Sequence, residues 1–194
     1  MISRPLREPE KGLGLTVLPY ARTAAIIGAH PTVTDDRITF EERLQIYKGT
    51  KTRWSDGREI IVLTREPGDT SIEVLEREIP GFAPAYAESH KAKRWTTLYT
   101  DQGMNRVLAR TPYAIGFSDM GTITAERLPI KVLKMNGVLP TPENVLSGRF
   151  PLVKRLAFVF LKDKLPDGAK AFLDFVRSSE GGKVLRASGY LPAK

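Results

Sequence analysis

Continuous apolar runs alternate along this chain with segments in which apolar residues recur at helical spacing. Runs such as Ala24–Ala29 and Ile60–Leu63 are apolar throughout, as expected for strands buried on both faces. The alternation of the two patterns predicts an α/β fold with mainly parallel sheets. Strands are expected over residues 15–18 and 23–29, broken by Pro19, and over 59–65, 97–99, 113–117, 130–135 and 152–161.

Helix boundaries are marked by capping residues and by glycines. Thr39 and Glu42 form the ends of a capping box, and Gly49 ends the helix that follows. A second capping box, Thr70–Glu73, predicts a helix that runs to about Ile79. Further helices are expected over 83–91, 100–109, from Thr141-Pro142, over 168–177, and from Ser178 or Ser179 to Gly189.

Composition narrows the class of protein. The 194 residues are 41% hydrophobic and 27% charged, which is ordinary for a folded domain or for two small lobes. No uncharged apolar stretch is long enough for a transmembrane helix. Cysteine is absent and only two histidines occur, which excludes disulfides, thiolate catalysis and a histidine-rich metal site.

The formal net charge of +8 suits an anionic partner of some kind. Lysine and arginine are scattered along the chain, and the tightest group, Lys91, Lys93 and Arg94, carries three charges. A basic intracellular module that binds nucleic acid or another macromolecule stays open as an alternative. The scatter favours a small anion, and no nucleic acid is expected.

The sharpest local signal for chemistry is the strand that ends at Arg65, followed by a glycine-containing loop and a helix start at Thr70-Ser71. A helix N-terminus offers unpaired N–H groups and partial positive charge, and Arg65 adds a forked cationic donor. Asp69 could accept a hydrogen bond from a protonated oxygen. The sequence therefore predicts a site for a small oxyanion here, with an ordinary capped βα loop as the alternative because Glu73 adds negative charge.

Signs of catalysis are weak. No phosphate-binding loop, dinucleotide fingerprint or nucleophile elbow occurs. His30 is interpreted as a strand-end residue and His90 as a helix-end residue. We predict no enzyme activity, no cofactor and no metal, and a structural role for Trp54 in a turn between lobes.

Four segments together resemble one family. Residues 46–57 (IYKGTKTRWSDG), 111–117 (TPYAIGF) and 171–181 (AFLDFVRSSEG), followed by GYLP at 189–192, are similar to segments of the phosphate-type substrate-binding proteins of ABC transporters. Ser3-Arg4-Pro5-Leu6 resembles the segment that follows a strand of the family's first lobe. The matches occur in order and cover nearly the whole chain.

The resemblance implies a type II periplasmic-binding-protein-like fold, in which two lobes close over a ligand. Lobe 1 is then expected at residues 1–59 and 136–194, incomplete because it lacks the family's N-terminal strands, and lobe 2 at residues 60–135. A small oxyanion such as phosphate would bind between them at Arg65, Asp69, Thr70, Ser71, Ser3 and Arg4. The loop from Arg65 is one residue shorter than the family's phosphate loop and carries Asp69 where the family has Ser-Gly.

The resemblance also implies partners and a location. An ABC transporter permease would receive the closed receptor, and the protein would be periplasmic or extracellular if a signal peptide precedes this segment. The chain as given, which begins Met1-Ile2-Ser3, has none. The incomplete lobe would leave an apolar edge or face open, so we also expect a homo-oligomer.

Overall fold

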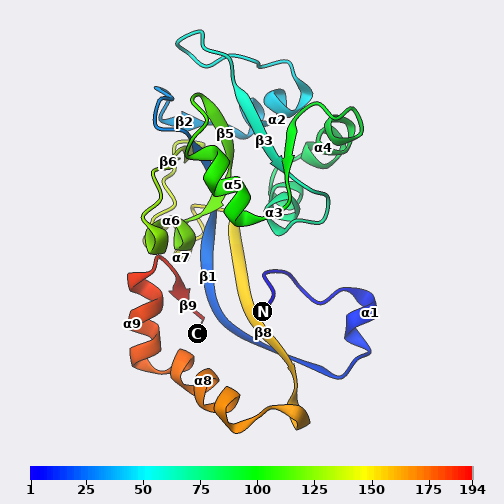
Figure 1. The fold of residues 1–194 in the computed structure, drawn as a ribbon, viewed down its shortest axis with the longest axis vertical. Helices are drawn as coiled ribbons and strands as arrows, with labels where there is room; N and C mark the ends of the chain where they lie inside the picture. The colour runs from blue at the N-terminus through cyan, green and yellow to red at the C-terminus, as the bar shows by residue number, and fades with distance from the viewer. Residues whose placement is uncertain (194) are drawn as a thin grey trace.

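A long antiparallel ribbon of two strands runs through the molecule and carries helices at both ends (Figure 1). The computed structural model describes residues 1–193. The ribbon consists of β1 (Leu15–Ala29) and β8 (Val153–Leu161), which pair from Leu15 opposite Leu161 to Ala24 opposite Val153. The half of β1 from Ala24 onward is almost entirely buried, as its continuous apolar run requires.

The sheet beyond the ribbon is mixed. Its order is β4 (Thr96–Leu98), β3 (Ile61–Arg65), β5 (Ala114–Asp119), β1 and β6 (Lys131–Val132). Pairing is parallel among β4, β3 and β5, as expected, and antiparallel wherever β1 takes part. The remaining strands are a parallel pair, β2 (Arg37–Ile38) with β7 (Lys134–Met135), and β9 (Leu191–Pro192) against β1.

Four of the predicted helix caps are observed. Thr39 opens α2 with the predicted capping box, Thr100 caps α5, Thr141 caps α7 and Ser178 caps α9. The helices of residues 1–193 are α1 (Glu8–Lys11), α2 (Phe40–Lys48), α3 (Thr70–Glu78), α4 (Phe82–Lys91), α5 (Asp101–Leu108), α6 (Met120–Glu126), α7 (Pro142–Leu146), the 3-10 turn η1 (Lys162–Lys164), α8 (Asp167–Arg177) and α9 (Ser179–Ala187).

The predicted break at Pro19 is wrong, and the structure supplies the reason. Both backbone groups of Ala157, which lies opposite Pro19, hydrogen-bond Ile2 on the other side of β8. The carbonyl of Ala157 is therefore already bonded and needs no N–H from Pro19. A proline at this position of the ladder loses no hydrogen bond. The register then shifts by one residue at Tyr20, a bulge that the strand accommodates without ending.

Two further details differ from the expectation. Asp69, not Thr70, caps α3, and Thr70 is the first helical residue. The expected strand at 130–135 is interrupted into β6 and β7, because its two halves pair with different partners, β1 and β2.

Buried apolar side chains are unevenly distributed along the chain. One continuous core takes residues from Ala24 to Leu152, including Tyr47 and Trp54. The Trp54 indole N–H donates to the carbonyl of Tyr113 at 2.9 Å, so residues 30–59 pack with residues 60–135 rather than apart from them. This packing favours placing residues 30–59 with residues 60–135, and the predicted burial of Trp54 is confirmed.

We call residues 24–152 the central body and residues 1–23 with 153–193 the terminal body. The central body is the upper part of Figure 1, and the terminal body is the lower part, with α8 and α9. Within its described residues the terminal body buries few apolar side chains, namely Ala21, Ala157 and Leu173. Its stability therefore depends heavily on the ribbon that it shares with the central body.

Candidate functional site

The loop between β3 and α3 brings together most of the predicted ligand-binding residues. β3 ends at Arg65, Gly68 turns the chain with a φ of 81°, and Asp69 caps the helix. The Asp69 carboxylate accepts a hydrogen bond from the N–H of Ser71 at 2.9 Å. Ser71 is buried, and the hydroxyl of Thr70 lies at the start of the helix, where the peptide dipoles favour negative charge.

Arg65 is the charged centre of this site. Its side chain is 6% exposed and forms ion pairs with Asp69 at 3.0 Å, with Glu66 at 3.1 Å and with Asp101. Burial alone would lower the pKa of the guanidinium, but its hydrogen bonds to Glu66 and the charges of Asp69 and Asp101 raise the pKa above the ordinary value. Arg65 is therefore a permanent cation held in place on three sides.

A segment of the terminal body closes over the start of α3. The Ser3 hydroxyl donates to the Thr70 hydroxyl at 2.9 Å, a contact between residues 67 positions apart. Arg7 extends the same contact, since its guanidinium lies 3.6 Å from the Glu73 carboxylate. Figure 1 shows this N-terminal segment emerging between β8 and the region below α3. The site thus draws side chains from both bodies.

Arg4 is the exception among the six predicted residues. Its guanidinium binds Glu10 through two hydrogen bonds, at 2.7 and 2.8 Å, instead of joining the Arg65 cluster. Glu10 also accepts from the backbone N–H of Arg7. The hydrogen bond from Arg4, together with that from Arg7, lowers the pKa of Glu10 to about 2. In this arrangement Arg4 holds the segment that carries Ser3 and Arg7.

Asp101 and Glu66 are the members of the cluster that the sequence analysis did not single out. Asp101 begins α5, directly after β4, and Leu98 of β4 lies opposite Arg65 in the parallel register. The carboxyl ends of neighbouring parallel strands meet at one edge of the sheet. The adjacent predicted strand and the helix start at Thr100 were therefore a usable signal for Asp101.

The arrangement combines donors with carboxylates, which limits the ligands it can hold. Arg65, the hydroxyls of Ser3, Thr70 and Ser71, and the helix dipole all favour an anion. Asp69 beside them repels any anion unless a proton lies between the two. The geometry is suited to an oxyanion that still carries a hydrogen.

Other features of the described chain bear on the class of site. Within residues 1–193, no group of three or more histidine, cysteine, aspartate and glutamate side chains is placed to hold a metal ion. None of the helices in this range is long and apolar enough to cross a membrane. One cavity of about 380 Å³ lies beside β4, and an apolar groove of about 280 Å³ lies between β8 and the α8–α9 pair.

Comparison with known proteins gives a consistent result. Residues 1–180 match the PBP superfamily domain. The phosphate-binding protein PstS 2 of Streptococcus agalactiae is 27% identical over 103 residues, which span 53% of this chain but only 34% of that protein. The phosphate-binding protein PstS of Borreliella burgdorferi is 22% identical over 199 residues, or 99% of this chain and 71% of that protein.

Solved structures show the same fold. A Clostridium perfringens protein assigned to the phosphate ABC transporter substrate-binding proteins, solved with bound phosphate, superimposes with a TM-score of 0.85 at 22% identity. The match covers 99% of this chain and 77% of that one. These relatives are named as binding proteins, not enzymes, and the nucleic-acid alternative finds no support among them.

Proposed function

The chain belongs to the PBP superfamily domain family, and on that premise we propose that it binds a protonated oxyanion, hydrogen phosphate above all, between its two bodies. The observation that carries the proposal is the contact between Ser3 of the terminal body and Thr70 at the start of α3. Thr70 directly follows Asp69, which is ion-paired with the buried cation Arg65 at 3.0 Å, so hydroxyls from both bodies lie near a fixed charge. An anion at this place would be held from both sides.

The carboxylates determine which oxyanion is preferred. Asp69 is linked to Arg65 and to the Ser71 N–H, so it stays beside the ligand and can accept one hydrogen bond from it. Hydrogen phosphate has a hydrogen to donate, whereas sulfate at neutral pH has none. We therefore propose that the site rejects sulfate, because sulfate has no hydrogen to place between its negative charge and the Asp69 carboxylate.

Arg65 must exchange some of its present partners for the ligand. The Asp101 side chain is 59% exposed, compared with 11% for Asp69, so Asp101 can turn into solvent while Asp69 remains. Ligand binding would then replace the Asp101 ion pair. This exchange predicts that Asp101 competes with phosphate for the same guanidinium.

The lobes and partners follow from the same proposal. The central body would be lobe 2 and the terminal body lobe 1, with closure around the ligand signalled to an ABC transporter permease. Such a receptor works outside the cytoplasm, in the periplasm or at the cell exterior. A second copy of this chain is a further proposed partner, because the terminal body exposes Phe172, Phe175 and Val184.

Calorimetric titration with phosphate and with sulfate tests the proposal. Phosphate should bind with a Kd near micromolar, about −8 kcal/mol. Arg65→Lys should weaken binding by about tenfold or more, since lysine lacks the forked donor geometry. Thr70→Val should weaken it about three- to tenfold through loss of one hydroxyl.

Arg77→Gln is the control, because Arg77 is an exposed arginine at the far end of α3 and pairs with Glu78. It removes an arginine outside the site and should leave phosphate affinity unchanged. Asp101→Asn should tighten phosphate binding. Equal affinity for the parent chain, Arg65→Lys and Arg77→Gln would refute the proposed site.

A further inference from the structure

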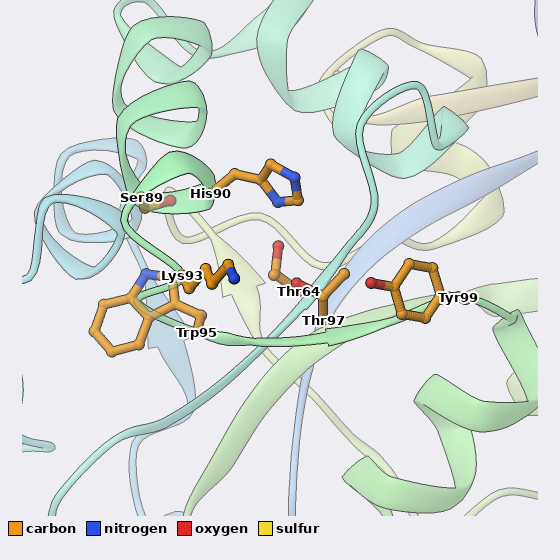
Figure 2. Close-up of a pocket in the computed structure, with 7 residues that line it drawn as sticks. All are labelled: Thr64, Ser89, His90, Lys93, Trp95, Thr97 and Tyr99. Carbon is orange, nitrogen blue, oxygen red and sulfur yellow. The ribbon is translucent and has the colours of Figure 1, made fainter.

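The cavity of about 380 Å³ beside β4 is separate from the site just described. Its walls are the last turn of α4, the loop after it and one face of β3 and β4 (Figure 2). The lining residues are Thr64, Ser89, His90, Lys93, Trp95, Thr97 and Tyr99. Neighbouring residues of a strand point to opposite faces, so Thr64 faces this cavity while Arg65 faces the cluster with Asp69 and Asp101.

The polar groups of this cavity are predominantly donors. None of the seven lining residues is acidic, and Lys93 brings an ammonium group. Trp95 contributes its ring to the wall, while its indole nitrogen is shielded from the cavity.

The buried guanidinium of Arg43 sets the direction of the hydrogen bonds that end at Thr64 in the cavity wall. Arg43 is fully buried and lies over the rings of Tyr47 and Phe117, and no ion pair with a carboxylate is found for it within residues 1–193. Its Nη2 donates to the Tyr47 hydroxyl at 3.4 Å, and that hydroxyl lies 2.7 Å from the Thr64 hydroxyl. With Tyr47 accepting from Arg43 and donating to Thr64, the Thr64 hydroxyl is left to donate into the cavity.

Flat apolar surfaces complete the walls. Trp95 and Tyr99 flank β4 and project from the same face as Thr97. On the α4 side, the ring of His90 lines the cavity and stacks on the ring of Tyr86. Figure 2 shows Lys93, Thr64, Thr97 and the Tyr99 hydroxyl arranged around a common space. An inorganic ion would leave these rings in contact with water, and a neutral ring compound would leave Lys93 unpaired.

We propose that this cavity is a second binding site, for a small aromatic carboxylate. The carboxylate accepts from Lys93 and from the threonine hydroxyls, and the ring packs against Trp95 and Tyr99. The volume lies within the range of small-molecule sites. The site belongs to the central body alone, so it operates whether or not the interlobe site is filled.

Benzoate is the probe, and calorimetry of the full chain is the measurement. The parent chain should bind benzoate saturably at one site, with unchanged affinity in saturating phosphate. Lys93→Asn should weaken binding about tenfold or more, as expected for loss of a charged hydrogen bond. Asparagine suits the positive φ of 49° at this position, so backbone strain does not confuse the result.

Lys91→Asn is the matched control, because Lys91 is an exposed lysine of the same helix end and does not line the cavity. It should leave benzoate affinity within about twofold of the parent value. Thr97→Val removes a hydroxyl of the wall and keeps the shape of the side chain, and it should weaken binding severalfold while phosphate affinity stays constant. Absence of saturable benzoate binding, competition by phosphate, or equal loss in Lys91→Asn and Lys93→Asn would overturn the proposal.

Discussion

At the scale of single residues, a carboxylate paired with an arginine makes the stability of the fold depend on pH. The pKa of Glu10 in the folded chain is about 2, compared with an ordinary value of 4.5, because of its hydrogen bonds from Arg4 and from the backbone of Arg7. A carboxylate with a lowered pKa in the folded state stabilises the fold above its unfolded pKa. That contribution is lost as the pH falls from about 4.5 towards 2.

Glu10→Gln should therefore flatten the acid limb of the stability curve. Urea denaturation at intervals from pH 6 to pH 2 measures the free energy of unfolding at each point. The parent chain should lose more stability across this window than the variant does. Glu8→Gln is the control, since Glu8 is 84% exposed at the side chain and pairs only with Lys11. Parallel curves for the parent and Glu10→Gln would show that the Arg4 pair contributes nothing.

Trp54 offers a second prediction at this scale. It is 4% exposed, lies in the core of the central body and donates its indole N–H to Tyr113. Trp54→Ala should cost about 3–5 kcal/mol of unfolding free energy, because it removes a large buried side chain and a hydrogen bond. Tyr99→Ala, at a residue 71% exposed, should change the same quantity by at most about 0.5 kcal/mol. Chemical denaturation followed by circular dichroism separates the two outcomes.

At the scale of elements, the junction of α8 and α9 is the most constrained turn of the terminal body. Ser178 caps α9 by accepting from the N–H of Gly181 at 3.1 Å. A Cβ atom at Gly181 would collide with the backbone carbonyl of Phe175 and would lie 2.8 Å from the Cα of Val176. The two helices can approach this closely only because residue 181 is glycine.

Gly181→Ala should therefore separate the helices and destabilise the terminal body by about 1–3 kcal/mol. Gly168→Ala is the control, because a Cβ there meets nothing within 4 Å. It should be neutral or slightly stabilising, since alanine is the better helix former. A thermal melt of the three chains measures the difference, and an unchanged melting temperature for Gly181→Ala would contradict the crowding argument.

Local signals account for the elements that sequence reasoning found. Thr39, Thr100 and Ser178 each place a side-chain acceptor beside a helix start, and such caps act over three or four residues. The same reasoning placed Arg65 at a strand end and Thr70 and Ser71 at the start of α3. These features depend on neighbours in sequence, so the sequence alone reveals them.

The features that were missed depend on partners distant in sequence. Pro19 stays within β1 because Ala157 bonds Ile2, and the Arg65 pair with Asp101 requires β4 to lie beside β3. The hydrogen bond from the Trp54 indole to the carbonyl of Tyr113 joins positions 59 residues apart. Nothing in the local pattern at residues 19 and 54 contains this information, whereas the predicted strand and the helix start at Thr100 gave a partial signal for Asp101.

At the scale of the whole molecule, the two bodies are unequally packed. The apolar groove beside α8 and α9 includes Phe172 and Phe175, which are 54% and 49% exposed, and Val184 at 57%. Exposed apolar surface of this kind favours association. We expect the chain to exceed its monomer mass of 21.6 kDa in light scattering at tens of micromolar.

Phe172→Glu should shift the population towards the monomer, because it introduces a charge at the centre of the groove. Leu146→Glu, at a residue 53% exposed on α7 of the central body, is the control and should leave the mass unchanged. A parent chain that is monomeric throughout would exclude a second copy as the occupant of the groove. Loss of association in both variants would place the interface elsewhere.

The path of the ribbon has a consequence for how this architecture can be rearranged. The central body is one uninterrupted stretch of chain, and its two ends are neighbours, since the N–H of Ala25 donates to the carbonyl of Leu152 at 2.8 Å. A segment that leaves and returns at one point can be excised, transplanted or inserted into a host loop without stretching either flank. The central body can thus be transferred as one segment, together with its own core and the cavity beside β4. The terminal body consists of two separate pieces of chain and cannot be transferred in this way.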